Sequence, residues 1–522
     1  MINELRLRNL RSFSNETNSE YVKIKPITVL VGKNSSGKSS FLRSFPLLRQ
    51  SVEAKTTGPV LWYGSYVDFG AYSEAKSNDT NDDQIYFDFN LTVPVSKKIN
   101  NFFNHFYVSS NSTENLNINI EIGVSENKNK TIAKSLKISV HEIKFEISFD
   151  TSEKCSLKVN GVEEITLDNL SYRIGVEFLP HIGEMIKSEK TMNGQNIVIR
   201  RFNHEFIKEH FTKKYKSEIR SYFHKNTSDE TIFDTIERIG IITKNELPSI
   251  LKSYYRGNST FEKNLHLYKD EIVDKFYKLS ISRSLSEIIS HISTELENTF
   301  KNVRYIAPLR ATAERYYRHQ DLQVEEIDHT GSNLAMFLKS FSESEKRSFT
   351  NWTRDYFGFS VRVDELGLHY ALKIKTENDP IEYNINDMGF GFSQILPIVA
   401  SIWIETNRQR QKSKQLIFAI EQPELHLHPE YQARLAKLFS LVIKDAIQKR
   451  IDIRIIFETH SKTMINTLGD CVEEGIISED MINIVLFEKE HSNSSTKVRF
   501  SKFDEDGSLV DWPIGFFSGR TE

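Results

Sequence analysis

Residues 32–39 read Gly32-Lys33-Asn34-Ser35-Ser36-Gly37-Lys38-Ser39, and this motif indicates the fold of the chain. It fits the pattern G-x-x-x-x-G-K-[ST] in full, and it lies between an apolar strand at 27–31 and a helix-like segment at 40–43. Glycine at positions 32 and 37 lets backbone N–H groups and the following helix N-terminus approach phosphate oxygens. The sequence therefore predicts a nucleoside triphosphate site in an α/β fold.

The chemistry of this loop assigns a role to its last residues. Lys38 is expected to reach the β- and γ-phosphates, and the Ser39 hydroxyl to ligate Mg²⁺. We expect Ser40 to line the nucleotide as well. A glycine- and serine-rich turn can match the pattern by chance, but the strand before it and the helix after it favour the phosphate loop. ATP and Mg²⁺ are the predicted cofactors.

A second motif supplies a carboxylate. The apolar run 416–420 ends in Glu421-Gln422-Pro423-Glu424. A carboxylate at the end of an apolar strand is typical of Mg²⁺ binding in phosphoryl-transfer sites, so Glu421 is the predicted metal ligand. Gln422 can orient a water but is a poor base, because an amide does not accept a proton as a carboxylate does. Glu424 is the nearest alternative base, and hydrolysis is expected to be slow.

A third motif follows a second apolar strand. The run 453–457 leads into Glu458-Thr459-His460-Ser461. His460 could act as a hydrogen-bonding sensor of the γ-phosphate, although a single histidine at a strand end is more often structural. We count Glu421, Gln422, Glu424 and His460 as the candidate catalytic residues.

Composition limits the class of protein. In 522 residues, 39% are hydrophobic, which suffices for sizeable cores, and the formal net charge of −3 does not identify a partner. Cys155 and Cys471 form no disulfide framework or zinc spacing, which favours a reducing cytoplasm. Charges interrupt Met1–Asn9, so we expect no signal peptide, and the apolar run 395–404 is too short to span a bilayer. These features predict a soluble cytoplasmic protein.

The spacing of apolar residues changes along the chain. Residues 1–171 are predicted to form the N-terminal lobe of an ATPase head, with the phosphate loop and a β-rich subdomain of alternating antiparallel strands. Residues 172–300 show apolar residues at three- and four-residue steps, which predicts a helical insertion. Residues 301–522 return to strand patterns and are expected to form the C-terminal lobe.

These motifs together resemble a known group. The quoted segments are Leu7-Arg8-Asn9-Leu10-Arg11-Ser12-Phe13, Gly391-Phe392-Ser393-Gln394, Glu421-Gln422-Pro423-Glu424-Leu425-His426-Leu427-His428-Pro429 and Thr459-His460-Ser461. They are similar to the ABC-type ATPase heads of the SMC, RecF and OLD group. Further segments narrow the resemblance: Tyr66–Gly70, Tyr305–Arg310, Asp506–Ser508 and Trp512–Phe517. They resemble the PtuA ATPases of Septu and retron anti-phage systems, over roughly residues 1–75 and 300–522.

The resemblance implies an ATP-driven homodimer. In such heads, the signature of one subunit covers the ATP on the phosphate loop of the other, which assigns Gly391, Ser393 and Gln394 to the second subunit's γ-phosphate. The sequence alone leaves residues 389–394 as a turn before a helix. His426 and His428 could suggest a metal site, but in related heads this turn links the two subunits, and we favour the non-metal interpretation.

Three classes of function fit the motifs. The first is a defence ATPase that controls a separate effector, for which the resemblance implies an HNH-type nuclease (PtuB-like) and also allows a reverse transcriptase with its RNA–DNA hybrid. The second is an OLD-like ATPase–nuclease, which needs a Toprim domain that residues 461–522 are too few to hold. The third is a DNA repair or chromosome-associated head, although no long heptad arms are visible. We favour the first.

Nucleic-acid binding has one candidate segment. Residues 200–225 carry eight lysines and arginines interleaved with aromatic residues, which suits phosphate contact combined with base stacking. A solvated amphipathic helix whose aromatic side chains pack inward is the alternative, and the pattern favours that alternative. Direct contact with DNA stays open.

Overall fold

The computed structural model describes residues 1–16, 19–54, 56, 58–96, 113–174, 177–192, 195–239, 241, 243–318, 324, 326–377, 379–407, 414–491 and 494–513. The chain divides into two compact units. Unit 1 comprises Met1, Lys55–Val60 and Asp83–Glu297, and unit 2 comprises Ile2–Ala54, Leu61–Asp82 and Asn298–Glu522. The predicted tail segment beyond Pro513 lies outside the described residues. The predicted boundaries at residues 171 and 300 stay predictions.

A seven-stranded sheet forms the centre of unit 2. Its strands, in spatial order, are β13 (Val303–Ile306), β18 (Leu416–Glu421), β19 (Ile453–Glu458), β3 (Ile27–Gly32), β20 (Ile482–Glu488), β21 (Lys497–Phe503) and β22 (Leu509–Val510). The first five are parallel and the last two antiparallel. Every residue of β3 and β18 is buried, because helices cover both faces of a parallel sheet and favour continuous apolar runs.

The helices of unit 2 bury their apolar faces with this sheet in one core. They are α1 (Lys38–Glu53), α2 (Tyr72–Ala75), α9 (Leu334–Lys339), α10 (Glu343–Phe357), η1 (Ile385–Met388), α11 (Phe390–Asn407), α12 (Pro429–Lys449), α13 (Lys462–Glu473) and η2 (Glu479–Met481). Fully buried Trp403 of α11 and Phe439 of α12 join strand residues in the same hydrophobic cluster. The core thus fixes the ends of β18, β19 and β3.

Two smaller strand groups complete unit 2. β1 (Ile2–Arg8) pairs antiparallel with β2 (Val22–Lys23). A second group consists of β14 (Tyr317–Arg318), β15 (Phe359–Leu366), β16 (His369–Thr376) and β17 (Tyr383–Asn384), all paired through β16. Among the residues that the structure describes, no helix is both long and apolar enough to cross a membrane.

Unit 1 contains the antiparallel sheet that alternating hydrophobicity predicted. Its strands pair in chain order: β4 (Ile85–Ser96), β5 (Thr113–Asn127), β6 (Lys130–Val140), β7 (Ile143–Phe149), β8 (Cys155–Val159) and β9 (Val162–Ile165). β7 alternates strictly between buried and more exposed side chains, as expected when one face of a sheet meets a core.

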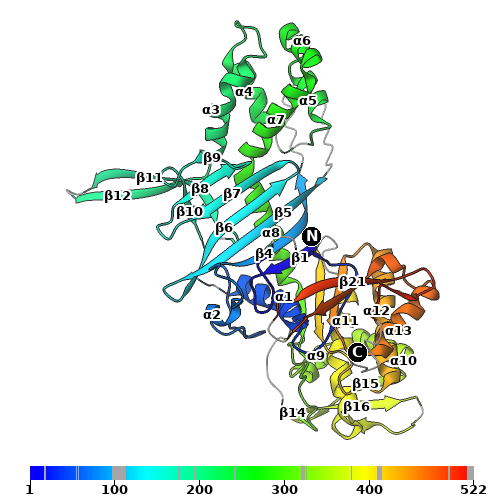
Figure 1. The fold of residues 1–522 in the computed structure, drawn as a ribbon. Helices are drawn as coiled ribbons and strands as arrows, with labels where there is room; N and C mark the ends of the chain where they lie inside the picture. The colour runs from blue at the N-terminus through cyan, green and yellow to red at the C-terminus, as the bar shows by residue number, and fades with distance from the viewer. Residues whose placement is uncertain are drawn as a thin grey trace. The chain divides into compact units, whose positions relative to one another are not determined.

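A hairpin and a helical group follow that sheet. The three-stranded group is β10 (Ser171–Arg173), β11 (His181–Met192) and β12 (Gln195–Asn203), and Figure 1 shows β11 and β12 as a long hairpin that extends away from the other strands of unit 1. The helices are α3 (Phe206–Arg220), α4 (Asp229–Arg238), α5 (Leu247–Tyr254), α6 (Ser259–Leu267), α7 (Lys269–Arg283) and α8 (Leu285–Lys301).

The helical prediction for residues 172–300 is therefore wrong at its beginning and right from residue 206 onward. Residues 181–203 form a hairpin instead. The consecutive β-branched residues Ile197, Val198 and Ile199 explain the difference, because such side chains lose rotamer freedom in a helix and fit a pleated strand.

Candidate nucleotide site

The phosphate loop leaves β3 and enters α1 in unit 2, as the sequence predicts. Gly32 and Gly37 have φ angles of 153° and 107°, a backbone region that residues with a side chain rarely adopt. A Cβ atom on Gly32 would lie 2.3 Å from the carbonyl oxygen of Phe487, and one on Gly37 would lie 2.7 Å from Oγ1 of Thr496. Glycine at both positions therefore lets the loop turn closely against β20 and against Thr496, the residue before β21.

The polar groups of this loop fit a triphosphate. Lys38 is only 4% exposed, and its Nζ donates to the carbonyl oxygens of Gly32 at 3.0 Å and Lys33 at 2.9 Å. The Ser36 hydroxyl is buried without a hydrogen-bond partner, and α1 begins without a side-chain cap. These groups offer donors to an anion, and bound ATP with Mg²⁺ would supply the phosphoryl group and the cation that balances its charge.

Burial and nearby carboxylates act on the pKa of Lys38 in opposite directions. Removal from water lowers the pKa of Lys38, and the nearby carboxylates of Glu458 and Glu424 oppose that effect. A cavity of about 620 Å³ lies over the loop, with Arg11, Lys76 and Lys489 among its lining residues. The cavity gives a bound nucleotide access to Lys38 from a partly cationic surface.

Glu421, the predicted metal ligand, is bound on both carboxylate oxygens. It is 1% exposed at the end of β18. Arg43 of α1 donates from Nε to Oε1 at 2.7 Å and from Nη2 to Oε2 at 2.8 Å, and the Tyr305 hydroxyl donates to Oε1 at 2.6 Å. The hydrogen bond to Glu421 raises the pKa of Arg43, and burial raises the pKa of Tyr305. Glu421 is therefore part of a charge-assisted network.

Glu458 is a residue of the site that the sequence analysis did not assign. It ends β19, the strand between β18 and β3, and its Oε2 accepts a hydrogen bond of 2.7 Å from Oγ of Ser39. Burial raises the pKa of Glu458, and the carboxylate of Glu421 adds to that rise. The signal was present in the sequence, because Glu458 ends an apolar strand just as Glu421 does.

The turn after β18 is held in a strained shape. Gln422 has a φ of 41°, and its N–H donates to the carbonyl oxygen of Glu458 at 3.1 Å. Arg310 donates from Nη2 to the carbonyl oxygens of Glu421 at 3.0 Å and Gln422 at 3.4 Å. Burial lowers the pKa of Arg310 to about 10. The Arg310 side chain and the backbone of β19 together hold the backbone of Gln422 in place.

Glu424 connects this turn to the third motif. Its Oε1 accepts a hydrogen bond of 2.8 Å from the backbone N–H of His460, while its Oε2 is buried without a partner. Burial raises the pKa of Glu424. Burial and the nearby Lys38 lower the pKa of His460, which favours the neutral ring. The structure thus brings Glu424, His460 and Lys38 into one electrostatic neighbourhood.

A match to a protein family covers most of this chain. Residues 1–465 match the model of a family described as an AAA ATPase domain. The chain belongs to this ATPase family. Its membership and its observed elements confirm the predicted α/β fold class. A search of curated proteins finds no match.

Several solved structures share a likeness with this ATPase domain. One is an Smc head bound to the C-terminal winged-helix domain of ScpA, with 11% identity, a TM-score of 0.36 and coverage of 97% of this chain and 98% of that chain. Another is an Smc head with a coiled coil and joint derived from Pyrococcus yayanosii, with 11% identity, a TM-score of 0.32 and coverage of 97% and 98%. A third is the recombination mediator RecF, with 12% identity, a TM-score of 0.28 and coverage of 95% and 98%.

The segment predicted to be the signature lies at the start of α11. The helix begins at Phe390, directly after Gly389 with its φ of 79°, so the segment is a helix start rather than a free turn. The Ser393 hydroxyl donates to the carbonyl oxygen of Phe390 at 2.7 Å, and both Ser393 and Gln394 are buried. Contact of Gly391, Ser393 and Gln394 with a second subunit's nucleotide stays a prediction.

The two histidines of the turn have separate environments. His428 is the N-cap of α12, and its Nδ1 accepts a hydrogen bond of 3.3 Å from the N–H of Glu430. His426 has a φ of 61°, and its ring lies 5.9 Å from that of Phe390. His428 therefore has a capping role, and His426 packs beside the signature helix.

Proposed function

We propose that this chain is an ABC-type ATPase of a bacterial anti-phage defence complex, which closes as a homodimer around ATP and controls a separate nuclease. The observation that carries the ATPase part is the phosphate loop, where Lys38, the unpartnered Ser36 hydroxyl and the uncapped start of α1 converge. The defence role is supported by the resemblance of the motifs to PtuA ATPases. An HNH-type nuclease is the proposed effector, and a reverse transcriptase with its RNA–DNA hybrid is a proposed additional partner.

Hydrolysis is proposed to be slow, with Glu424 as the base. Gln422 follows the strand-end carboxylate of Glu421, at the position where a base would be expected, and an amide cannot accept the proton of the attacking water. Glu424 is the nearby carboxylate with an unpartnered buried oxygen, and burial raises its pKa toward the range that suits a general base. A slow step would leave a long-lived ATP-bound state, which suits a protein that holds a partner.

The first experiment tests ATP binding. Lys38→Ala removes the cation that faces the β- and γ-phosphates, so calorimetry should detect no ATP binding in a variant whose circular dichroism is unchanged. Lys462→Ala is a matched control, because Lys462 is also the first residue of a helix and is exposed. Unchanged ATP affinity in folded Lys38→Ala protein would contradict the assignment of the loop.

The second experiment tests the effector. The purified chain should leave DNA and RNA intact in the presence of ATP and Mg²⁺. Co-expression with the proteins encoded beside its gene should recover a complex that contains an HNH-type nuclease. Cleavage by the chain alone, lost in the Lys38→Ala variant, would instead favour the OLD-like function.

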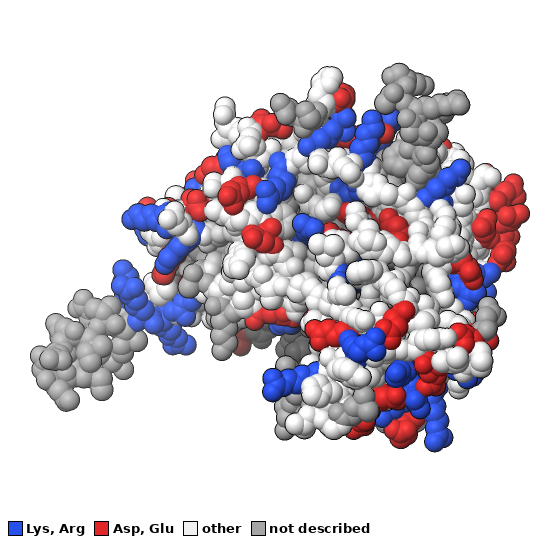
Figure 2. Space-filling view, turned by 90° about the horizontal axis from the view of Figure 1, so that it is seen from below, with Lys and Arg blue, Asp and Glu red and all other residues white. Residues whose placement is uncertain are grey.

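A DNA-binding ATPase of the repair or chromosome type is the second candidate function. Lys187 of β11 and Arg200 of β12 are exposed and lie directly opposite each other, and Arg201 is the next residue. Like charges directly opposite each other destabilise a hairpin. Among the described residues, none forms an ion pair with Lys187, Arg200 or Arg201. Figure 2 shows blue side chains gathered where the hairpin leaves the rest of unit 1. A phosphate backbone would relieve this repulsion.

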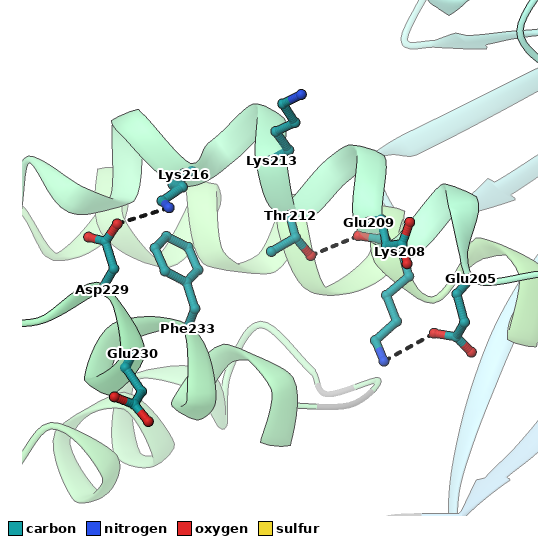
Figure 3. A pocket seen from close by; sticks show the side chains of 9 residues that line it. All are labelled: Glu205, Lys208, Glu209, Thr212, Lys213, Lys216, Asp229, Glu230 and Phe233. Atoms are coloured by element: carbon teal, nitrogen blue, oxygen red, sulfur yellow. Dashed lines mark hydrogen bonds and ion pairs between the residues drawn. The ribbon is translucent and has the colours of Figure 1, made fainter.

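The segment 200–225 contributes less to such binding than its composition suggests. Phe202, Phe211, Tyr222 and Phe223 are buried, so these rings cannot stack on bases. Four cations of α3 already have acidic partners, in the pairs Lys208–Glu205, Lys214–Glu164, Lys216–Asp229 and Arg220–Asp229. Figure 3 shows two of these pairs in the groove between α3 and α4. The inward-packing alternative is the correct one for these four rings.

The hairpin gives the DNA function its own test. Replacing Lys187, Arg200 and Arg201 by serine should weaken binding to duplex DNA and reduce its salt dependence, because fewer counterions are released. Serine at Lys208, Lys214 and Lys216, whose charges are already paired, is the matched control, because it removes the same number of charges. Equal DNA affinity in wild type and the hairpin variant would contradict a role for the hairpin.

A further inference from the structure

The order of strands in unit 2 separates the two site carboxylates by their distance from the phosphate loop. β19 is paired directly with β3, with Glu458 opposite Leu30, whereas β18 lies one strand farther away, with Glu421 opposite Glu458. Neighbouring strands lie about 4.8 Å apart, so the backbone of Glu421 is roughly 10 Å from that of β3. Glu458 is the carboxylate on the strand adjacent to the loop.

The hydrogen bonds assign these carboxylates to different partners. Both oxygens of Glu421 accept from Arg43, and one also accepts from Tyr305. The Arg43 guanidinium therefore already balances the negative charge of Glu421 on both carboxylate oxygens. Glu458 instead accepts from the hydroxyl of Ser39, the residue that the loop pattern assigns to the metal.

Ser39 can serve both groups at once. A hydroxyl carries one proton and two lone pairs, so its oxygen can bind a cation while its proton stays on Glu458. The Glu458 carboxylate would then adjoin the coordination shell, where a negative charge strengthens cation binding and orients the ligand. Nothing in this arrangement requires the Glu421–Arg43 pair to open.

We infer that Glu458, rather than Glu421, is the carboxylate that positions the Mg²⁺ of bound ATP, acting through Ser39 and on the cation itself. Glu421 then has a structural task, which is to hold Arg43 of α1 against the end of β18. This inference rests on the proposed ATP-binding function and names the residue that completes its metal site. Glu458 is a positioning residue in this scheme.

Binding of Mn²⁺ tests the inference without relying on turnover. Electron paramagnetic resonance of free Mn²⁺ would measure cation affinity in the presence of ATP, for wild type, Glu458→Gln, Glu421→Gln and Glu488→Gln. Glutamine keeps the shape and can still accept from Ser39, but it removes the charge. Glu488 is a matched control, because it ends β20, the other neighbour of β3, and is ion-paired with Arg499 outside the site.

The expected result is a loss of Mn²⁺ affinity of roughly 10- to 100-fold in Glu458→Gln alone. ATP affinity measured in EDTA should be unchanged or tighter in that variant, because a negative charge near Lys38 is gone. Loss of Mn²⁺ affinity in Glu421→Gln with wild-type affinity in Glu458→Gln would overturn the inference. Absence of ATP binding by wild type in EDTA and in Mn²⁺ would reject the proposed function instead, so the two failures are distinguishable.

Discussion

Replacing Glu421 by alanine should destabilise unit 2 even in the absence of nucleotide. The change removes a carboxylate that accepts two hydrogen bonds from Arg43 and one from Tyr305. Tyr305 is buried, so its hydroxyl would lose its partner where water cannot easily replace it. The Arg43 side chain is 39% exposed, so water can solvate part of its charge.

The magnitude follows from these contacts. Truncating one partner of a fully buried ion pair costs about 3–5 kcal/mol, and the exposure of Arg43 reduces that figure. A buried tyrosine hydroxyl left unsatisfied adds about 1–3 kcal/mol. We therefore expect Glu421→Ala to lower the free energy of unfolding by about 3–4 kcal/mol. For a unit of roughly 300 residues, that corresponds to a melting temperature lower by roughly 5–6 °C.

Thermal melts and urea titrations of the nucleotide-free protein would measure the loss, with Arg43→Ala and the double variant completing a cycle. The coupling between Arg43 and Glu421 should be about 1–2 kcal/mol, because the pair is bidentate but partly solvated. Glu430→Ala is a control, since Glu430 makes an exposed pair with Arg434. A Glu421→Ala protein that melts within 2 °C of wild type would refute the structural role of this network.

Three further outcomes follow from the site. Burial raises the pKa of Glu424, so the rate of hydrolysis with Glu424 as base should increase as pH rises through that raised pKa and should be low at lower pH. Glu424→Gln should abolish this rise of the rate with pH. A pH–rate profile unchanged by the substitution would contradict the assignment of Glu424 as base. The same shift predicts that the Glu424 contribution to stability declines as pH rises from the unfolded to the folded pKa, and urea titrations at several pH values would measure it. Ser393→Arg should block ATP-driven dimer closure while leaving nucleotide binding by the monomer nearly intact. Mixing Ser393→Arg subunits with Lys38→Ala subunits should restore at most one intact ATP site per dimer. Wild-type activity of either single variant would count against a site shared between subunits.

Part of the candidate site could be read from local patterns. Phosphate loops place glycines, lysine and serine within eight consecutive residues, so Gly32, Gly37 and Lys38 needed no long-range information. Glu421 at the end of one strand and His460 two residues after the end of another followed from apolar runs and their length. Residues 181–203 were assigned to the wrong secondary structure, because the helical periodicity of the following segment was extended backwards over a β-branched run.

Local sequence patterns were sufficient to predict the phosphate loop, the apolar strands that precede the acidic motifs, and the alternating strands of unit 1, because each depends on residues close in sequence. The partner of each carboxylate, in contrast, depends on the tertiary fold. Ser39 and Glu458 are 419 positions apart, and Arg43 and Glu421 are 378 positions apart. Those contacts depend on β19 lying between β3 and β18, and strand order is set by the packing of the whole core. Local hydrophobic patterns specify that a strand forms, but they do not specify its neighbours.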